Sequence, residues 1–112
     1  MARPTNFEIK GGRSGSAATV SIAGELDMST AQMLSQHVDQ HLSSGVTDLT
    51  LDLREIAFMD SSGLRLLIEL NNRSQQQAWR LTLTPPKHEG ATLVLRATGA
   101  DTRLPFAQRM DR

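Results

Sequence analysis

The sequence predicts an α/β domain in which helices pack on a sheet whose strands are partly parallel. Some segments alternate apolar and polar residues, which is typical of strands, and others repeat apolar residues every three or four positions, which is typical of helices. The two kinds of segment alternate along the chain, and strand–helix–strand units of this kind favour parallel strands covered by helices. The 112 residues are enough for one domain, and no internal repeat or second core is visible.

The first half predicts a hairpin, a helix and a strand. The helix rests on Leu34, Val38 and Leu42, which recur every four residues, and Asp27 or Ser29 can cap its start. A Gly/Ser-rich stretch without the features of a phosphate-binding loop is expected to be the hairpin turn. The expected elements are strands at 7–9 and 19–24, their loop at 11–16, a helix at 29–43 and a strand at 48–53.

The second half predicts a helix, a strand and a third helix. An apolar connection at 56–59 leads to a helix that opens at 60–63, with Leu64, Leu67, Ile68 and Leu70 expected in the core. Residues 71–77 are expected to end that helix. A strand at 79–84 follows, with Leu81 and Leu83 inward, and then a helix within 89–98 that uses Leu93, Val94 and Leu95. In the tail, Leu104 and Phe106 are expected to dock.

Composition narrows the function classes. The absence of cysteine excludes disulfides and thiolate metal sites, and fits a reducing compartment. Twelve basic and twelve acidic residues cancel, which gives no footprint for direct nucleic-acid binding. No apolar stretch approaches the ~20 residues of a membrane span, so we expect a cytoplasmic protein without membrane contact. His37 and His41 share a helix face but lack a third ligand, so no metal site is expected.

The charges are unevenly distributed. Residues 14–53 contain no Lys or Arg but five acidic side chains, whereas the chain from Arg54 onward carries nine basic and six acidic residues. One interpretation is an acidic face that selects a partner by charge. The other, which we favour, is the ordinary fluctuation of a small domain.

The segment Asp60-Ser61-Ser62-Gly63 lies between a strand and an amphipathic helix, where sites of α/β sheets often form. Asp and Ser are also the preferred helix caps, so a purely structural role is the first reading of the spacing alone. A hydrolytic serine is opposed by the missing Gly-x-Ser-x-Gly pattern and by histidines that show no relation to the serines. We therefore do not expect an enzyme.

A family resemblance enters with these residues. Residues 51–67, Leu-Asp-Leu-Arg-Glu-Ile-Ala-Phe-Met-Asp-Ser-Ser-Gly-Leu-Arg-Leu-Leu, resemble the signature of the STAS domain, and more narrowly that of bacterial anti-sigma factor antagonists. Residues 24–27, Gly-Glu-Leu-Asp, resemble a second family motif. Residues 97–101 are similar to a third, Leu-Thr-Gly-Leu-Asp, except that Ala100 replaces the usual Leu. The resemblance implies a STAS-like domain over residues 5–106, a frayed tail at 107–112, and a mixed four- to five-stranded sheet with helices mainly on one face.

The resemblance also implies a regulatory switch without a cofactor. The unmodified antagonist binds an anti-sigma factor that is itself a serine kinase and so releases the sigma factor. Phosphorylation by that kinase ends binding, and a serine phosphatase restores it. The implied phosphoacceptor is the second serine, Ser62. The implied partner-binding residues around it are Glu25, Asp27, Asp60, Ser61 and Gly63. The motifs do not specify the oligomeric state.

Elementary electrostatics is compatible with such a switch. A phosphate adds about −1.5 to −2 charges at neutral pH, and a helix N-terminus tolerates an anion. In a close interface the same charge would be repelled by Asp60 and Asp27, and Gly63 is expected to leave room for a kinase beside the acceptor. The alternative is a STAS-like interaction module of another assembly that is never phosphorylated, in which the serines are caps only.

Overall fold

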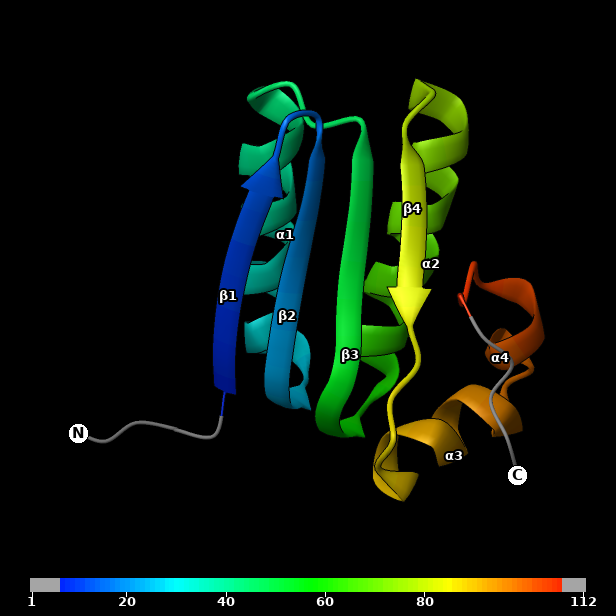
Figure 1. The fold of residues 1–112 in the computed structure, drawn as a ribbon. Coiled ribbons are helices and arrows are strands. Elements are labelled where there is room, and N and C mark those ends of the chain that lie inside the picture. Colours follow the sequence, from blue (N-terminus) through cyan, green and yellow to red (C-terminus); the bar gives the residue numbers. More distant parts are fainter. Residues whose placement is uncertain (1–6, 108–112) are drawn as a thin grey trace.

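The computed structural model describes residues 7–107 as one sheet with helices (Figure 1). The elements in chain order are β1 (Phe7–Ser14), β2 (Ala17–Leu26), α1 (Met28–Ser43), β3 (Asp48–Met59), α2 (Ser61–Gln77), β4 (Arg80–Thr84), α3 (Glu89–Ala97) and α4 (Ala100–Arg103). The strands lie in the order β1-β2-β3-β4, with β1 antiparallel to β2 and the other two pairings parallel. The predicted α/β class and the mixed sheet are confirmed, with four strands.

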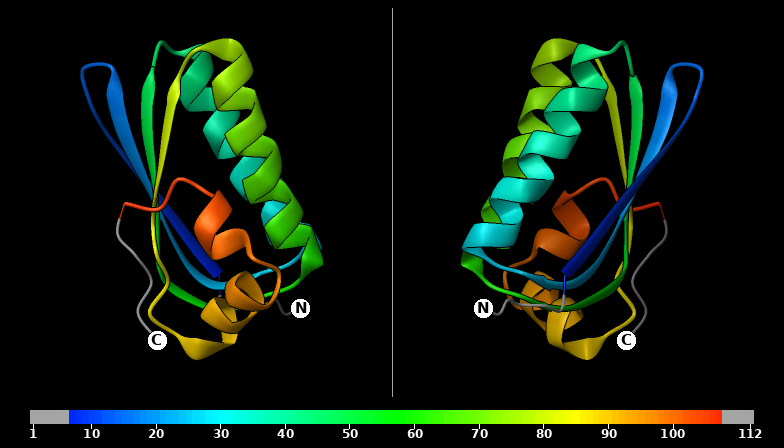
Figure 2. Two further views of the ribbon diagram at one scale, coloured as in Figure 1. Left: turned by 90° about the vertical axis from the view of Figure 1, so that its right-hand side faces the viewer. Right: turned by 90° about the vertical axis from the view of Figure 1, so that its left-hand side faces the viewer.

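The two long helices α1 and α2 cover one face of the sheet, as expected (Figure 2). Leucines 49, 51 and 53 of β3 are fully buried beneath them, which follows from the period of two in this strand. Leu34 and Val38 of α1 are fully buried as well. In the described part of the chain, residues 7–107, no helix lies on the opposite face of the sheet (Figure 2).

The predicted hairpin is confirmed, but the expected bounds of its loop, 11–16, are wrong. Strand β1 continues through Gly11 and Gly12, which pair with Val20 and Thr19 of β2, and the turn is at Gly15 and Ser16. Gly15 has φ 64°, a left-handed conformation that glycine adopts without strain. Backbone pairing along an edge strand needs no side chain, so glycines inside β1 do not end it.

The predicted connection at 56–59 is also wrong, because β3 continues to Met59. The register between β2 and β3 shifts twice, between Ser21 and Ala23 and again between Gly24 and Glu25. At each shift β3 contributes an extra residue, as in a β-bulge, and the alternation of its side chains is interrupted. Ile56 and Met59 are therefore both fully buried at a spacing of three.

The core face of α2 differs from the prediction at two positions. Leu67 and Leu70 are buried as expected, but Ile68 is 43% exposed and Leu64 is only half-buried. Leu66 is buried in their place. The helix ends at Gln77, the last residue of the polar stretch expected to end it, and Ala78 follows in the left-handed conformation.

The chain after β4 packs differently from its apolar pattern. In α3, Ala91 and Leu95 are buried, whereas Leu93 is 57% exposed, so that part of the prediction is wrong. Leu104 and Phe106 dock as expected: Leu104 is buried, and Phe106 forms a parallel bridge with Leu83 of β4. Residues 5–6 and 108–112, where the predicted domain begins and most of the tail lies, are outside the described residues.

Candidate functional site at the start of two parallel helices

The candidate site lies where β2 and β3 end and their helices begin. Leu26 and Met59 are register partners at the last position of these parallel strands. The next residue in each chain segment, Asp27 or Asp60, caps the following helix. Asp27 and Asp60 therefore follow register-paired residues at the same edge of the sheet, as the carboxyl ends of parallel strands do.

A groove runs between α1 and α2 on their outer surface. Arg73 of α2 donates a hydrogen bond to Asp39 of α1 at 3.0 Å, over a separation of 34 residues. Met28 and Ser62, which line the groove at its other end, are also 34 residues apart. The two helices therefore run parallel and in register. The exposed and half-buried lining residues are Met28, Gln32 and Ser35 of α1, and Ser62, Arg65 and Glu69 of α2. The groove has a volume of about 320 Å³.

Ser62 lines this groove from the first turn of α2. Its side chain is half-buried, and within residues 7–107 its hydroxyl makes no hydrogen bond to protein. Helix capping is done by Asp60, whose Oδ1 accepts from the backbone N–H groups of Ser62 at 2.9 Å and Gly63 at 3.2 Å. The reading of the serines as caps is therefore wrong, and the Ser62 hydroxyl is available for chemistry.

Asp27 belongs to a tight cap around Thr30. Its Oδ1 accepts from the backbone N–H groups of Ser29 and Thr30, each at 3.1 Å. The hydroxyl of Thr30 accepts from the Asp27 N–H at 2.8 Å and donates to the carbonyl oxygen of Glu25 at 2.7 Å. The pKa of Asp27 is lowered, mainly by the Thr30 N–H bond and then by the hydroxyl bonds of Ser29 and Thr30, so this carboxylate stays ionised.

Gly63 has a different role from the one expected. It is buried, and a Cβ at this position would lie 2.6 Å from the carbonyl oxygen of Leu26 and 3.0 Å from Cγ of Met59. The expectation that Gly63 leaves room for an approaching kinase is wrong, since that space is filled by the protein's own core. Gly63 instead lets α2 begin close against the end of β2.

Three further residues at this end have features that the sequence reading missed. Met28, directly after the cap Asp27, is 74% exposed, and Phe58 is 45% exposed and pairs in register with Glu25. Arg65 is exposed in the groove, one helical turn after Ser62. The exposure of Met28 could have been predicted from the sequence, because Met28 lies at the start of a helix whose core stripe is Leu34, Val38 and Leu42.

The acidic first half does not form one face. Asp39 pairs with Arg73 at 3.0 Å, and Asp52 pairs with Arg54 at 2.8 Å. Both bases come from the basic second half of the chain. Glu25 and Asp27 lie near the candidate site, at the carboxyl end of β2. Asp48 lies at the other end of this strand, where it pairs with Ala17. The uneven charge in the sequence is thus largely balanced in space.

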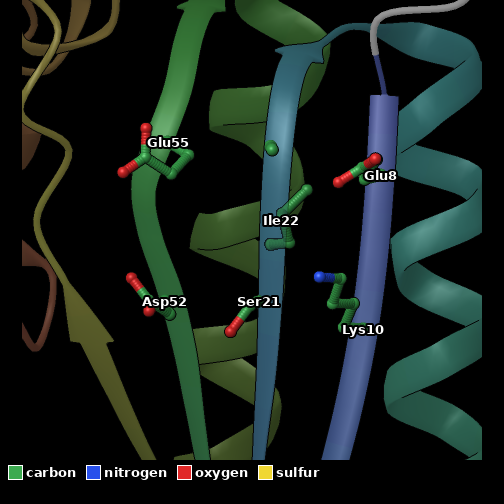
Figure 3. Close-up of a pocket in the computed structure, with 7 residues that line it drawn as sticks. Glu8, Lys10, Ser21, Ile22, Asp52 and Glu55 are labelled. Carbon is green, nitrogen blue, oxygen red and sulfur yellow. The ribbon is translucent and has the colours of Figure 1, made fainter.

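A second depression, of about 160 Å³, lies on the helix-free face of the sheet (Figure 3). Two of its carboxylates have partners: Asp52 accepts from Arg54, and Glu55 pairs with Lys87 at 2.9 Å and His88 at 3.4 Å. The pKa of Asp52 is lowered chiefly by the Arg54 hydrogen bond, and that of Glu55 chiefly by the Lys87 hydrogen bond. Groups held ionised in this way are poor proton donors and acceptors near neutral pH.

Across residues 7–107, no three His, Asp or Glu side chains gather where they could hold a metal ion. Within the same range, no helix has the length and apolar character needed to cross a membrane.

The chain is similar to known regulatory proteins. It is 28% identical over 76 residues to the anti-sigma-F factor antagonist RsfB of Mycobacterium tuberculosis, which covers 68% of this chain and 62% of that protein. It is 32% identical over 71 residues to osmosensory protein A of the same species, covering 62% of this chain and 44% of that protein. The chain thus spans less than two thirds of the length of these curated relatives.

Solved structures share the fold, and a family model shares the sequence pattern. An anti-sigma factor antagonist from Mycobacterium paratuberculosis superposes with a TM-score of 0.77 at 22% identity, over 95% of this chain and 89% of that one. The antagonist SpoIIAA in its unphosphorylated form gives 0.70 at 20% identity, over 91% and 88%. Residues 9–106 match the model described as "Mlab, STAS domain". The chain therefore belongs to the STAS domain family, as its motifs predict.

Proposed function

We propose that this protein is an anti-sigma factor antagonist controlled by phosphorylation of Ser62. In its unmodified form it binds an anti-sigma factor that is a serine kinase, and the sigma factor is released. The observation that carries the proposal is the Ser62 hydroxyl, which has no hydrogen-bond partner within residues 7–107 and faces the α1–α2 groove while Asp60 caps the helix. Anti-sigma factor antagonists among its relatives and structural neighbours support the partner class.

The proposed binding surface surrounds Ser62. It comprises the acidic side chains Glu25, Asp27 and Asp60, the exposed Ser61, and the buried Gly63, which acts only by setting the helix start. Met28 and Phe58 add exposed apolar area beside these charges. A mixed surface of this kind, with apolar anchors and a charged rim, is typical of a regulated protein interface.

The proposed switch is a phosphoryl transfer followed by hydrolysis. The kinase moves the γ-phosphoryl group of ATP to Oγ of Ser62; the bond to ADP breaks, and a kinase base takes the hydroxyl proton. A phosphatase later hydrolyses the ester and restores serine and inorganic phosphate. The protein itself supplies only the acceptor and is not the enzyme. Both steps use cytoplasmic partners, and this protein itself is proposed to use no cofactor, nucleic acid or membrane in either of them.

The phosphate would act through charge and crowding. It adds about −1.5 to −2 charges beside Asp60, and like charges placed in an interface cost several kcal/mol. Each 1.4 kcal/mol lowers affinity about tenfold, so a local change suffices to release the partner. The helix N-terminus tolerates an anion, so the fold is expected to survive.

The test is affinity isolation of the partner from the native cell, followed by incubation with that partner and ATP and measurement of intact mass. We expect one added phosphate in the natural protein and in Ser61→Ala, and none in Ser62→Ala. Phosphate on Ser62→Ala removes Ser62 from the role. A partner that is not a kinase, with no phosphate added, favours the unphosphorylated interaction module instead.

A further inference from the structure

Arg65 lies in the groove that Ser62 faces and has no partner within residues 7–107. Within residues 7–107 the ion pairs of other cations join Arg54 to Asp52, Arg73 to Asp39 and Lys87 to Glu55. Arg65 makes no ion pair there, although Glu69 lines the same groove one turn further on. Its guanidinium donors are therefore free to bind an anion that enters the groove.

The position of Arg65 suits an anion on Ser62 in particular. Residues three apart on a helix are neighbours, with Cβ atoms about 5–6 Å apart. The guanidinium group presents several N–H donors that match phosphate oxygens. The groove's volume, about 320 Å³, is far above the ~10–15 Å³ that a cavity needs to hold one water molecule, so a phosphate group fits within it.

Few other charges face this position. Asp60 lies at the cap on the α2 side, Glu69 lies beyond Arg65, and Asp27 caps α1 at the same end. The α1 residues that line the groove are not titratable. Among the described residues that line the groove, Arg65 is thus the one cation and Glu69 the one carboxylate.

Resting on the proposed phosphorylation of Ser62, we propose that the phosphate stays in the α1–α2 groove, paired with the guanidinium of Arg65. The pairing fixes the phosphate at the groove mouth and prevents it from swinging into solvent. The groove is then filled where Met28 and Gln32 would otherwise be open to a partner. Arg65 is accordingly a positioning residue: it holds the phosphate in the groove, where the phosphate keeps the partner from binding.

The test uses protein in which phosphoserine is inserted at position 62 during translation. The second ionisation of the phosphate, near pH 6 in a free phosphoserine, is followed by ³¹P NMR against pH. A neighbouring cation favours the dianion, so the midpoint should be about 0.1–0.4 pH units lower in the natural protein than in Arg65→Gln. Arg65→Lys should recover part of the shift, because it keeps the charge but not the planar donor arrangement.

Arg80→Gln is the matched control, because it removes the same charge from an exposed residue beyond the opposite end of α2. Equal midpoints in the natural protein and Arg65→Gln, or an equal shift in Arg80→Gln, overturn the proposal. Circular dichroism of each variant confirms that it is folded. Since translation places the phosphoserine, a kinase that leaves Ser62 unmodified would contradict the proposed function without altering this result.

Discussion

The backbone N–H of Asp60 donates a hydrogen bond to the carbonyl oxygen of Leu26 at 3.2 Å. This bond joins the cap residue of α2 to the last residue of β2, which directly precedes the cap residue of α1. The starts of α1 and α2 are thereby fixed to each other through the backbone. Side chains on the surface at this end can change without moving the helices, which is what a surface that is modified and restored requires.

Gly63→Ala is expected to destabilise the protein by about 1–3 kcal/mol, as overpacking in a filled core does. The new Cβ would lie 2.6 Å from the Leu26 carbonyl oxygen, a backbone atom that cannot rotate away. In a domain of this size the loss corresponds to a fall in Tm of about 4 °C or more. Thermal unfolding followed by circular dichroism measures it.

Gly12→Ala is the control for that experiment. Nothing lies within 4 Å of a Cβ at Gly12, and its backbone is in a strand, so its stability should stay within about 0.5 kcal/mol of the natural protein. If the two alanine variants melt at the same temperature, the close approach of α2 to Leu26 is not what requires glycine at position 63.

Asp27 should make stability depend on pH in acid. Its pKa is lowered in the folded protein, whereas an unfolded aspartate titrates near about 3.9. Its charge therefore contributes stability that is fully present above about pH 5 and is lost as the pH falls through the folded pKa. Asp27→Asn keeps the cap but removes the titration, so the fall in stability between about pH 5 and 2 should be smaller than in the natural protein.

Asp52 and Glu55 also have lowered pKa values and lose stability in the same range, but they do so in both proteins. The difference between the two denaturation curves therefore isolates Asp27. Asp27→Ala, which also removes the hydrogen bonds of the cap, should cost about 1 kcal/mol at neutral pH. If stability falls equally with pH in the natural protein and in Asp27→Asn, Asp27 is not a source of the loss of stability in acid.

The sequence was sufficient for elements whose periodicity is regular. The leucines of 48–53 lie on one face of their strand, and the apolar stripe of α1 lies on one face of its helix. Both faces were predicted to be buried, and both are. Strand β3 beyond Leu53 was not, because the two register shifts place Ile56 and Met59 three apart, and a bulge is decided by pairing with β2. Periodicity within one segment carries no information about its neighbour's register.

The candidate site was predictable as a set of motif residues but not as a shape. The motifs indicated Asp27 and Ser62, yet neither reveals that α1 and α2 run in register at an offset of 34 residues. That offset places Met28 beside Ser62 and creates the groove. The burial of Gly63 against Leu26 is likewise a contact between distant segments, so its role could not be read from its neighbours in the chain.

Met28→Ser should weaken partner binding about fivefold or more while leaving stability unchanged. Met28 is 74% exposed beside Asp27, so it contributes little to the core but offers apolar area at the proposed interface. Isothermal titration calorimetry with the isolated partner measures the affinity. Met33→Ser is the matched control, since Met33 is 46% exposed on the same helix and does not line the groove. Equal losses in both variants would place the interface elsewhere on α1.

Ser62→Asp should separate binding from folding. The added carboxylate lies in the first turn of α2, where the helix dipole favours a negative charge, so Tm should stay within about 4 °C of the natural protein. The same charge lies beside Asp60 in the proposed interface, and affinity for the partner should fall about tenfold or more. Ser62→Ala should bind like the natural protein, because it removes only a hydroxyl that has no hydrogen-bond partner within residues 7–107. Loss of the folded state in Ser62→Asp, or full affinity in a folded Ser62→Asp, would each contradict a switch that acts locally on the binding surface.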